Sequence, residues 1–374
     1  MAAAKQPQAS RPHAWLHAWP AWLVLVAAFF RLASPDVPLG LAWGRAIVEH
    51  GALPATNVFS HMNPDRIVLL DKWLFQVVIY LVHSVSGPTG LVCLRVALLA
   101  VALWAATRAA RIRWDRLPHA LLAVCFSIAL LNRCYVRAEL VTWAAIPLTL
   151  CLVPSIARGQ KRSWLLLVLL QALWTNAHGY WVVGPMLWLT IGVGALLQPL
   201  LNRWGVGGAS EPRSRAACIR LLVAVGVALA AACLTPYGVR SFLHPVRLTM
   251  ELQGTDIMKH IVDDFGSPLE AVRRGGTIPF WACYVLGLGG VLAAVRLARR
   301  QRLDAEMLAL FALGLLLGVP YYRNSTIMAL CAVPLVAQSL RLTIVSHHAP
   351  VRRWHTAIAA LPALLWLATA FGGW

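Results

Sequence analysis

Four short segments of the sequence place polar side chains beside apolar runs, where they could do chemistry at the edge of a membrane. Ionisable groups at membrane depth are costly and usually serve a site. The segments are SPDVPLGLAWGRAIVEHG (34–51), NRCYVRAEL (132–140), WTNAHGYWVVG (174–184) and PYYRNSTIMALCAVPLV (320–336). Their candidate site residues are Asp36, Arg137, Glu139, Asn176, His178 and Arg323.

Together these side chains match the needs of a transfer reaction at a phosphate group. A carboxylate such as Asp36 can act as a general base on a hydroxyl. Cations and an imidazole can hold a phosphate and stabilise it as it leaves. A phosphate at a membrane edge indicates a polyprenyl-phosphate lipid as the partner.

Each candidate also has a simpler explanation, which the spacing alone leaves open. Asp36 could be a solvated loop carboxylate that only ends a helix. Arg137 and Glu139 could pair with each other, and Arg323 could extend to lipid headgroups as an anchor. His178 could be a hydrogen-bonded core histidine.

The segment around His178 favours a role in a site because its helix is short. The apolar run 164–177 has about 14 residues, or roughly 21 Å of helix, which is less than a hydrocarbon core of about 30 Å. Asn176 and His178 should therefore lie below the surface and face a cavity. Gly179 would allow the chain to reverse there.

The composition identifies the elements that must position these groups. Of the 374 residues, 59% are hydrophobic and 13% are charged, and the mean hydropathy is +0.67. Soluble domains are less apolar and about twice as charged, which excludes a soluble enzyme, a disordered chain and a coiled coil. The runs are apolar throughout rather than alternating, which excludes a β-barrel. We predict an all-α, polytopic membrane protein.

Eleven apolar runs predict about eleven membrane spans. Trp73–Val85, about 20 Å as a helix, is too short to span and is predicted to be a juxtamembrane helix in the first outer loop. The domain boundaries follow: a transmembrane domain over 1–345 and a basic inner loop with a C-terminal span over 346–374. The runs are 15–33, 88–107, 117–132, 139–157, 164–177, 180–200, 217–235, 277–295, 305–320, 325–344 and 355–372.

The distribution of charge predicts the orientation. With this assignment, one face carries 20 Lys and Arg against 4 Asp and Glu, and the other face carries 11 against 10. Cytoplasmic loops collect Lys and Arg, so the N-terminus should be cytoplasmic and the long loops 34–72 and 236–276 should be outside. The same bias explains the net charge of +19 without a nucleic-acid partner. We expect a multi-pass protein of the bacterial inner membrane.

The order of these motifs resembles the GT-C superfamily of membrane glycosyltransferases, which use polyprenyl-phosphate-linked sugars. It is most similar to a bacterial branch with a Trp-x-Asn-x-His-Gly motif. The matching stretches are SPDVPLGLAWGRAI, GALPATNVFS, DKWLFQVVIYL, YVRAEL, WTNAHGYW, LTPYGVR, IVDDFGSP and RNSTIMALCAVPLV, in order over roughly residues 15–340.

The resemblance implies a role for each candidate. Asp36 matches the first-loop acid that superfamily members use as a base or a metal ligand. Arg137 and Glu139 occupy the position that helps hold a metal or the donor phosphate. Asp36 and Glu139 are thus the candidate ligands of a divalent cation, Mg²⁺ or Mn²⁺. His178 and Arg323 lie where aminoarabinose transferases of lipid A carry lysines near the lipid phosphate.

The implied function is a glycosyltransferase of the cell envelope, acting on the outer face of the inner membrane. The chain departs from the branch pattern in its first loop, where Ser34 replaces an acid, Pro38 and Leu39 replace a Trp pair, and Gly40 replaces a His. Two alternatives therefore stay open. One is a transporter or flippase for lipids or polyprenyl carriers, and the other is a non-catalytic assembly protein that retains the fold.

Overall fold

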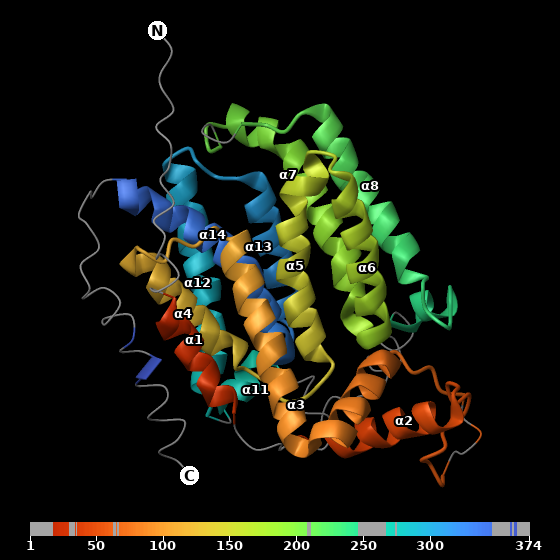
Figure 1. Ribbon diagram of the computed structural model, residues 1–374. Helices are drawn as coiled ribbons and strands as arrows, with labels where there is room; N and C mark the ends of the chain where they lie inside the picture. The colour runs from red at the N-terminus through yellow and green to blue at the C-terminus, as the bar shows by residue number, and fades with distance from the viewer. Residues whose placement is uncertain are drawn as a thin grey trace.

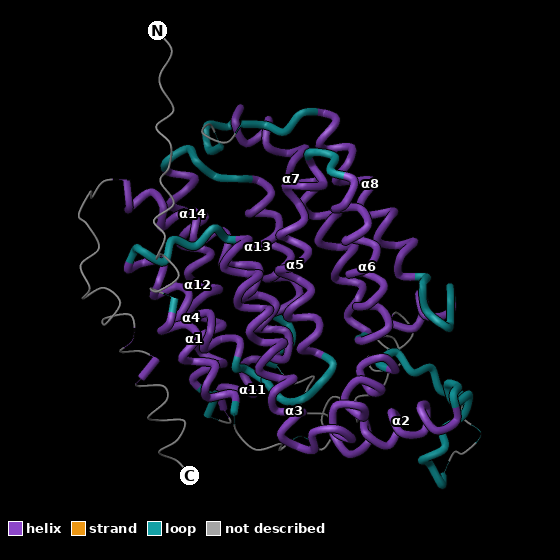
Figure 2. Tube along the Cα trace, in the orientation of Figure 1, coloured by secondary structure: helices purple, strands orange, loops and turns teal. Residues whose placement is uncertain are grey.

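The computed structural model describes residues 18–29, 34, 36–62, 65, 67–207, 211–245, 267–273, 275–345, 360 and 363–364, and helices are the regular secondary structure of this part of the chain. Within these residues the only β contact is an isolated bridge between Thr56 and Ile67, and no strand forms (Figure 2). The all-α prediction is confirmed. The elements are α1 (Trp19–Val24), η2 (Leu25–Ala28), α2 (Asp36–His50), α3 (Trp73–Ala109), α4 (Leu117–Leu130), α5 (Glu139–Ala157), α6 (Lys161–Ala177), η3 (Gly179–Val182), α7 (Val183–Arg203), α8 (Arg215–Ala232), α11 (Pro268–Arg273), α12 (Ile278–Arg299), α13 (Ala305–Gly318), η5 (Tyr322–Asn324) and α14 (Ser325–Val345).

Most of the long helices run side by side as a bundle, and α2 lies across one end of it (Figure 1). Within the described residues, six helical segments are long and apolar enough to cross a membrane, and α4 and α13 are shorter apolar helices. The chain is therefore a multi-pass membrane protein. The spans are 73–109, 139–157, 179–203, 215–232, 278–299 and 322–342. The predicted span 355–372 and the acidic run 261–265 lie almost entirely outside the described residues.

Polar side chains begin several of the helices by capping free backbone N–H groups. Ser214 accepts from Ala217 N at the start of α8. Thr277 accepts from Phe280 N before α12. Asp304 accepts from two backbone N–H groups of the first turn of α13. Ser, Thr and Asp are the residues that best satisfy these donors, so the local sequence determines where these helices start.

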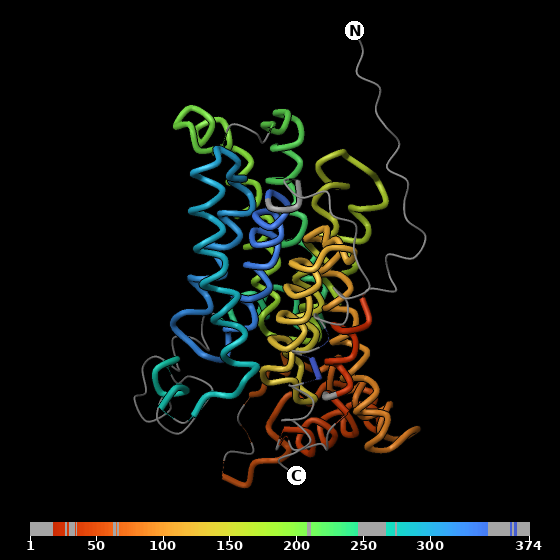
Figure 3. Tube along the Cα trace, turned by 90° about the vertical axis from the view of Figure 1, so that its left-hand side faces the viewer, coloured from red at the N-terminus to blue at the C-terminus, as the bar shows by residue number. Residues whose placement is uncertain are grey.

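The predicted juxtamembrane helix is the first part of α3. Gly87 has φ 61° and ψ −156° and is followed by Pro88, so the helix is interrupted and changes direction there. Glycine adopts positive φ without a steric penalty, and proline removes a backbone donor. The segment before Gly87 lies beside α2 at the end of the bundle, and the segment after it runs into the bundle (Figures 1 and 3).

The helix α2 was not expected, because a loop was predicted over 34–72. It packs on the first part of α3 through two glycines. A Cβ at Gly44 would overlap the backbone oxygen of Gln76, and a Cβ at Gly40 would lie 2.9 Å from Ile79 Cδ1. Gly44 must be small for the two helices to approach, because it meets backbone, and Gly40, where the branch pattern has a histidine, lies against the end of the Ile79 side chain.

Gly44→Ala is expected to destabilise the protein. The added methyl group has no space against α3, and overpacking of this kind costs about 1–3 kcal/mol. The measurement is thermal unfolding of the purified protein in detergent. Gly226→Ala in α8 is the matched control, because a Cβ there meets open space and alanine favours a helix by about 1 kcal/mol. Equal transition temperatures for the two variants would contradict the close packing of α2.

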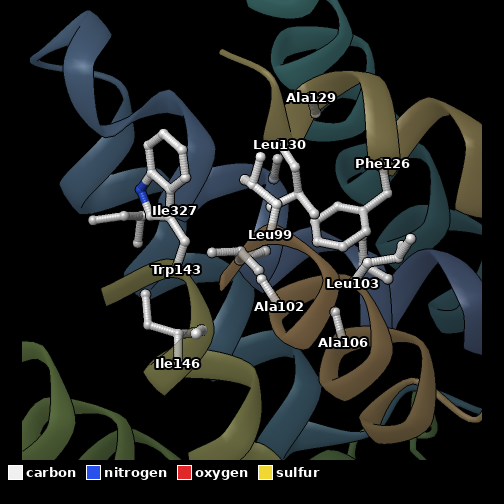
Figure 4. Packing of buried hydrophobic residues seen from close by; sticks show 14 of the residues in the cluster. Leu99, Ala102, Leu103, Ala106, Phe126, Ala129, Leu130, Trp143, Ile146 and Ile327 are labelled. Atoms are coloured by element: carbon white, nitrogen blue, oxygen red, sulfur yellow. The ribbon is translucent and has the colours of Figure 1, made fainter. Parts of the chain in front are cut away.

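The hydrophobic core of the bundle fixes the relative positions of the helices whose ends carry the polar segments. Leu99, Leu103 and Ala106 of α3 pack around Phe126 and Leu130 of α4, while Trp143 of α5 lies against Ile327 of α14 (Figure 4). All of these side chains are buried. The connection from α4 to α5 and the start of α14 are thereby held at the same end of the bundle as α2, which we call the α2 end.

Candidate functional site

Asp36 and Arg137 are brought together at the α2 end. Arg137 Nε lies 2.7 Å from Asp36 Oδ2 and also donates to Ser34 Oγ at 3.2 Å. Ser34 in turn accepts from the backbone N–H of Asp36. The Asp36 side chain is 60% exposed, whereas that of Arg137 is 18% exposed. The carboxylate is thus oriented on one side and accessible on the other.

Glu139, the first residue of α5, lies between two arginines. Its Oε1 is 3.3 Å from Arg323 Nη2 and its Oε2 is 3.6 Å from Arg133 Nε. All three side chains are largely buried. Two guanidinium groups contact this one carboxylate in a region of low dielectric, where electrostatic attraction is strong.

Arg133 has an unusual backbone conformation within this cluster. Its φ of 59° lies in the left-handed region, which non-glycine residues seldom adopt. Such conformations concentrate at functional sites, where the surroundings enforce them. The connection between α4 and α5 therefore holds Arg133 at some cost in backbone strain.

Tyrosine rings support both arginines. Arg133 Nη1 donates to the Tyr322 hydroxyl at 3.0 Å, and the Arg323 guanidinium lies 5.0 Å from the centre of the Tyr180 ring. A cation over an aromatic face gains about 0.5–2 kcal/mol. The Tyr180 ring is also 4.9 Å from the ring of His178. His178 therefore reaches the arginine cluster through Tyr180.

His178 is buried within a hydrogen-bonded network. Its Nδ1 is 2.7 Å from Thr142 Oγ1, which also accepts from Trp174 Nε1 at 2.8 Å. The Thr142 hydroxyl therefore links the His178 imidazole to the Trp174 indole. Burial lowers the pKa of His178 well below its usual value, and the charges of Lys72 and Arg323 act in the same direction. The imidazole is neutral.

Asn176 has both ends of its amide engaged. Its oxygen accepts from Trp73 Nε1 at 2.8 Å, and its nitrogen donates to the carbonyl oxygens of Ala172 and Leu234. These bonds join the end of α6 to the first residue of α3 and to the segment after α8. The structure thus gives Asn176 partners that position three parts of the chain at the α2 end.

Gly179 is required by close approach rather than by an unusual backbone angle. A Cβ at this position would lie 2.5 Å from Asp71 Oδ2. The helix α6 begins at Lys161, three residues before the predicted start, and its 17 residues span about 25 Å, still less than a hydrocarbon core. The carboxylate of Asp71 therefore lies next to the turn that carries His178.

Neither candidate metal ligand has the surroundings of a divalent cation site. Within the described residues, no group of three His, Cys, Asp or Glu side chains is arranged to hold a metal ion. Asp36 is paired with Arg137, and Glu139 is paired with Arg133 and Arg323. Mg²⁺ is normally bound through carboxylate, water and phosphate oxygens. The residues present do not fit this pattern, and no step proposed below passes through a metal.

Several residues of this site were not among the sequence candidates. Arg133 and Ser34 were noted in their segments without a role, and the supporting groups Thr142, Tyr180 and Tyr322 were not considered. A usable signal existed, because each tyrosine is close in sequence to a candidate: Tyr180 is two residues from His178 and Tyr322 is next to Arg323.

The fold of the chain is similar to that of an archaeal oligosaccharyltransferase in several solved structures. The Archaeoglobus fulgidus oligosaccharyltransferase tethered with an acceptor peptide matches with a TM-score of 0.56 at 10% identity, over 96% of this chain and 54% of that chain. Its apo form matches with a TM-score of 0.52 at 12% identity, over 96% of this chain and 55% of that chain. The complex of that archaeal enzyme, AglB, with an inhibitory peptide and a dolichol-phosphate gives 0.51 at 12% identity, with the same coverage.

These matches establish the fold of the chain and nothing finer. The chain spans about half the length of the oligosaccharyltransferase it matches. No protein-family model and no curated protein sequence matches it.

Proposed function

We propose that this protein is a membrane glycosyltransferase of GT-C type. It transfers a sugar from a polyprenyl-phosphate-linked donor to a hydroxyl of a cell-envelope acceptor, on the outer face of the inner membrane. The observation that carries the proposal is the buried cluster in which Arg133 and Arg323 both contact the carboxylate of Glu139. This cluster lies at the same end of the bundle as the accessible carboxylate of Asp36, on a fold similar to that of an oligosaccharyltransferase.

The proposed step needs one base and one anion site. The acceptor oxygen attacks the anomeric carbon of the donor, and its proton passes to Asp36. The bond between the anomeric carbon and the phosphate oxygen breaks, and the electron pair leaves with the phosphate. The guanidinium groups of Arg133 and Arg323 stabilise the negative charge that develops on the departing polyprenyl phosphate. Arg137 orients the base through its contact with Asp36.

His178 and Asn176 act as positioning residues in this proposal. His178 packs against Tyr180, whose ring lies against Arg323. Asn176 holds the start of α3 against the end of α6. Both therefore help to hold the side chains at the α2 end in the positions from which they bind the lipid phosphate.

A dolichol-phosphate complex of AglB supports a polyprenyl-phosphate lipid as the partner. That likeness is of the fold, so the proposal for this chain depends on the arginine cluster. A lipid with one phosphate group at the membrane edge matches a cationic cluster at the end of a helical bundle.

His178→Ala is expected to lower both thermal stability and affinity for polyprenyl phosphate. The change leaves the buried hydroxyl of Thr142 without one partner, which costs about 1–3 kcal/mol. It also removes the ring against which Tyr180 packs, so Arg323 loses support. Thermal unfolding and lipid binding are measured on the same purified variant. Unchanged affinity per folded molecule would limit His178 to a structural role.

The proposed orientation predicts opposite locations for two reporter fusions. A tag after Arg302, between α12 and α13, should report the cytoplasm, because that end of the bundle is rich in arginine. A tag after Ala52, which follows α2, should report the outside. If both tags report the same side, the site cannot lie where an outward-facing transferase needs it.

The experiment that tests the proposed function is mass spectrometry of a deletion strain. Loss of the transferase should remove a sugar from an envelope glycan and cause the polyprenyl-linked donor to accumulate. Wild-type protein and Glu49→Gln, which alters an exposed carboxylate of α2, should restore the glycan. Unchanged glycans and lipids would contradict the proposal. Donor that accumulates on the cytoplasmic side would instead support a flippase.

A further inference from the structure

A cavity of about 290 Å³ opens beside the arginine cluster. It lies between the connection from α4 to α5 and the segment that joins α11 to α12. Polar and aromatic side chains line it together, and it shares Arg133 and Tyr322 with the arginine cluster described above. The lining residues used below are Asn132, Arg133, Tyr135, Glu270, Phe280 and Tyr322.

We infer that this cavity binds a neutral saccharide unit. The inference rests on the proposed function and names the part of its substrate that the cavity would hold. Glu270 can accept hydrogen bonds from sugar hydroxyls, while Arg133 and Asn132 can donate to their oxygen atoms. Phe280 is almost fully buried, whereas Tyr135 is 37% exposed and offers an aromatic ring surface of the kind that the C–H face of a sugar ring requires.

The charges of the lining favour a neutral ligand over an anion. Arg133 is already shared with Glu139 and Tyr322, and Glu270 adds a second carboxylate to the cavity wall. A free phosphate would meet that carboxylate without a dedicated cation. A polyhydroxylated neutral ligand uses both signs of charge as hydrogen-bonding partners.

Glu270 is held in a defined orientation at the wall. Its Oε2 accepts from Ser267 N at 2.7 Å, and Ser267 Oγ accepts from Glu270 N. This reciprocal pair is a capping box. A carboxylate with a fixed orientation can discriminate between hydroxyl arrangements, so Glu270 is suited to select the sugar.

The cavity also adjoins both ion pairs of the proposed site. Arg133 lines it and contacts Glu139. Tyr135 lines it and lies 5.6 Å from the guanidinium of Arg137, measured to the ring centre. A sugar bound here would therefore be next to the phosphate cluster and next to the partner of Asp36. It is either the sugar of the donor or the first sugar of the acceptor.

Saturation-transfer NMR on the purified wild-type protein in detergent tests the inference. The probes are the methyl glycosides of glucose, galactose, mannose and N-acetylglucosamine, the corresponding sugar 1-phosphates, and inorganic pyrophosphate. At least one methyl glycoside should bind. Much tighter binding of its 1-phosphate would identify the donor sugar, because the phosphate would reach the arginines. Equal binding of the two forms would identify the acceptor sugar.

Two variants locate the binding. Ala271→Phe places a ring at the cavity wall and should abolish the glycoside signal, whereas Ala52→Phe, at an exposed position at the same end, should leave it unchanged. Glu270→Gln should weaken binding by at least about tenfold, since hydrogen bonds to charged groups are the stronger ones. Thermal unfolding confirms that each variant is folded.

The result that overturns the inference is distinct from failure of the proposed function. If the wild-type protein binds polyprenyl phosphate but no glycoside, the cavity is not a sugar site and the transferase proposal stands. If pyrophosphate alone competes for the cavity, the ligand class is wrong. If glycosides bind but polyprenyl phosphate does not, the cavity inference stands and the proposed function fails.

Discussion

Asp36→Asn is expected to lower the rate of sugar transfer by about two to four orders of magnitude, the usual contribution of a general base. Asparagine keeps the shape of the side chain and a hydrogen bond to Arg137, but it cannot take the proton from the acceptor. The Asp36 side chain is accessible, so the variant should express and fold normally. The measurement is turnover of a polyprenyl-phosphate sugar by the purified enzyme.

The control for Asp36 is another exposed carboxylate on the same helix. Glu49 pairs with Arg45 on the surface of α2, and Glu49→Gln should leave turnover unchanged. Near-normal turnover of Asp36→Asn would remove the base from the first loop. Asp71, whose carboxylate approaches Gly179, would then be the next residue to test.

Arg323→Ala should weaken binding of polyprenyl phosphate by roughly 10- to 150-fold, since a hydrogen bond to a charged group is worth about 1.5–3 kcal/mol. The change removes one of the two guanidinium groups that contact Glu139. The measurement is the affinity of purified protein for a polyprenyl phosphate in detergent.

A second substitution at Arg323 separates the effect of its positive charge from the effect of its planar geometry. Arg323→Lys keeps the charge but loses the planar contact with Tyr180, so it should recover only part of the affinity. Arg45→Ala removes an exposed arginine from the same end of the molecule and should have no effect. Wild-type affinity in a folded Arg323→Ala protein would show that the phosphate binds elsewhere.

The class of fold and the location of the polar groups could be predicted from the sequence. Lipid cannot hydrogen-bond to the backbone, so long apolar runs must form helices that satisfy their own groups. The same physics indicated that the short helix ending near His178 places polar groups below the surface, and both His178 and Asn176 are buried. The interruption at Gly87 and Pro88 was also predictable, because those residues act on their own backbone.

The sequence did not predict α2 or the partner of each charge. The helix α2 packs against α3 through Gly40 and Gly44. The sequence of α2 alone does not predict this contact, because it depends on the position of α3. Arg137 and Glu139 are two residues apart and were considered as partners, yet Arg137 pairs with Asp36 and Glu139 with Arg323.

The sequence by itself determined a helical membrane protein with its chemically useful side chains at the ends of apolar runs, because lipid solvation and backbone geometry act locally. Tertiary structure alone decided the site. The ion pair from Glu139 to Arg323 joins residues that are 184 positions apart, and the bond from Trp73 to Asn176 joins residues that are 103 apart. Such contacts depend on how helices pack against one another, and electrostatic attraction selects partners only among groups that packing has already brought within a few ångströms.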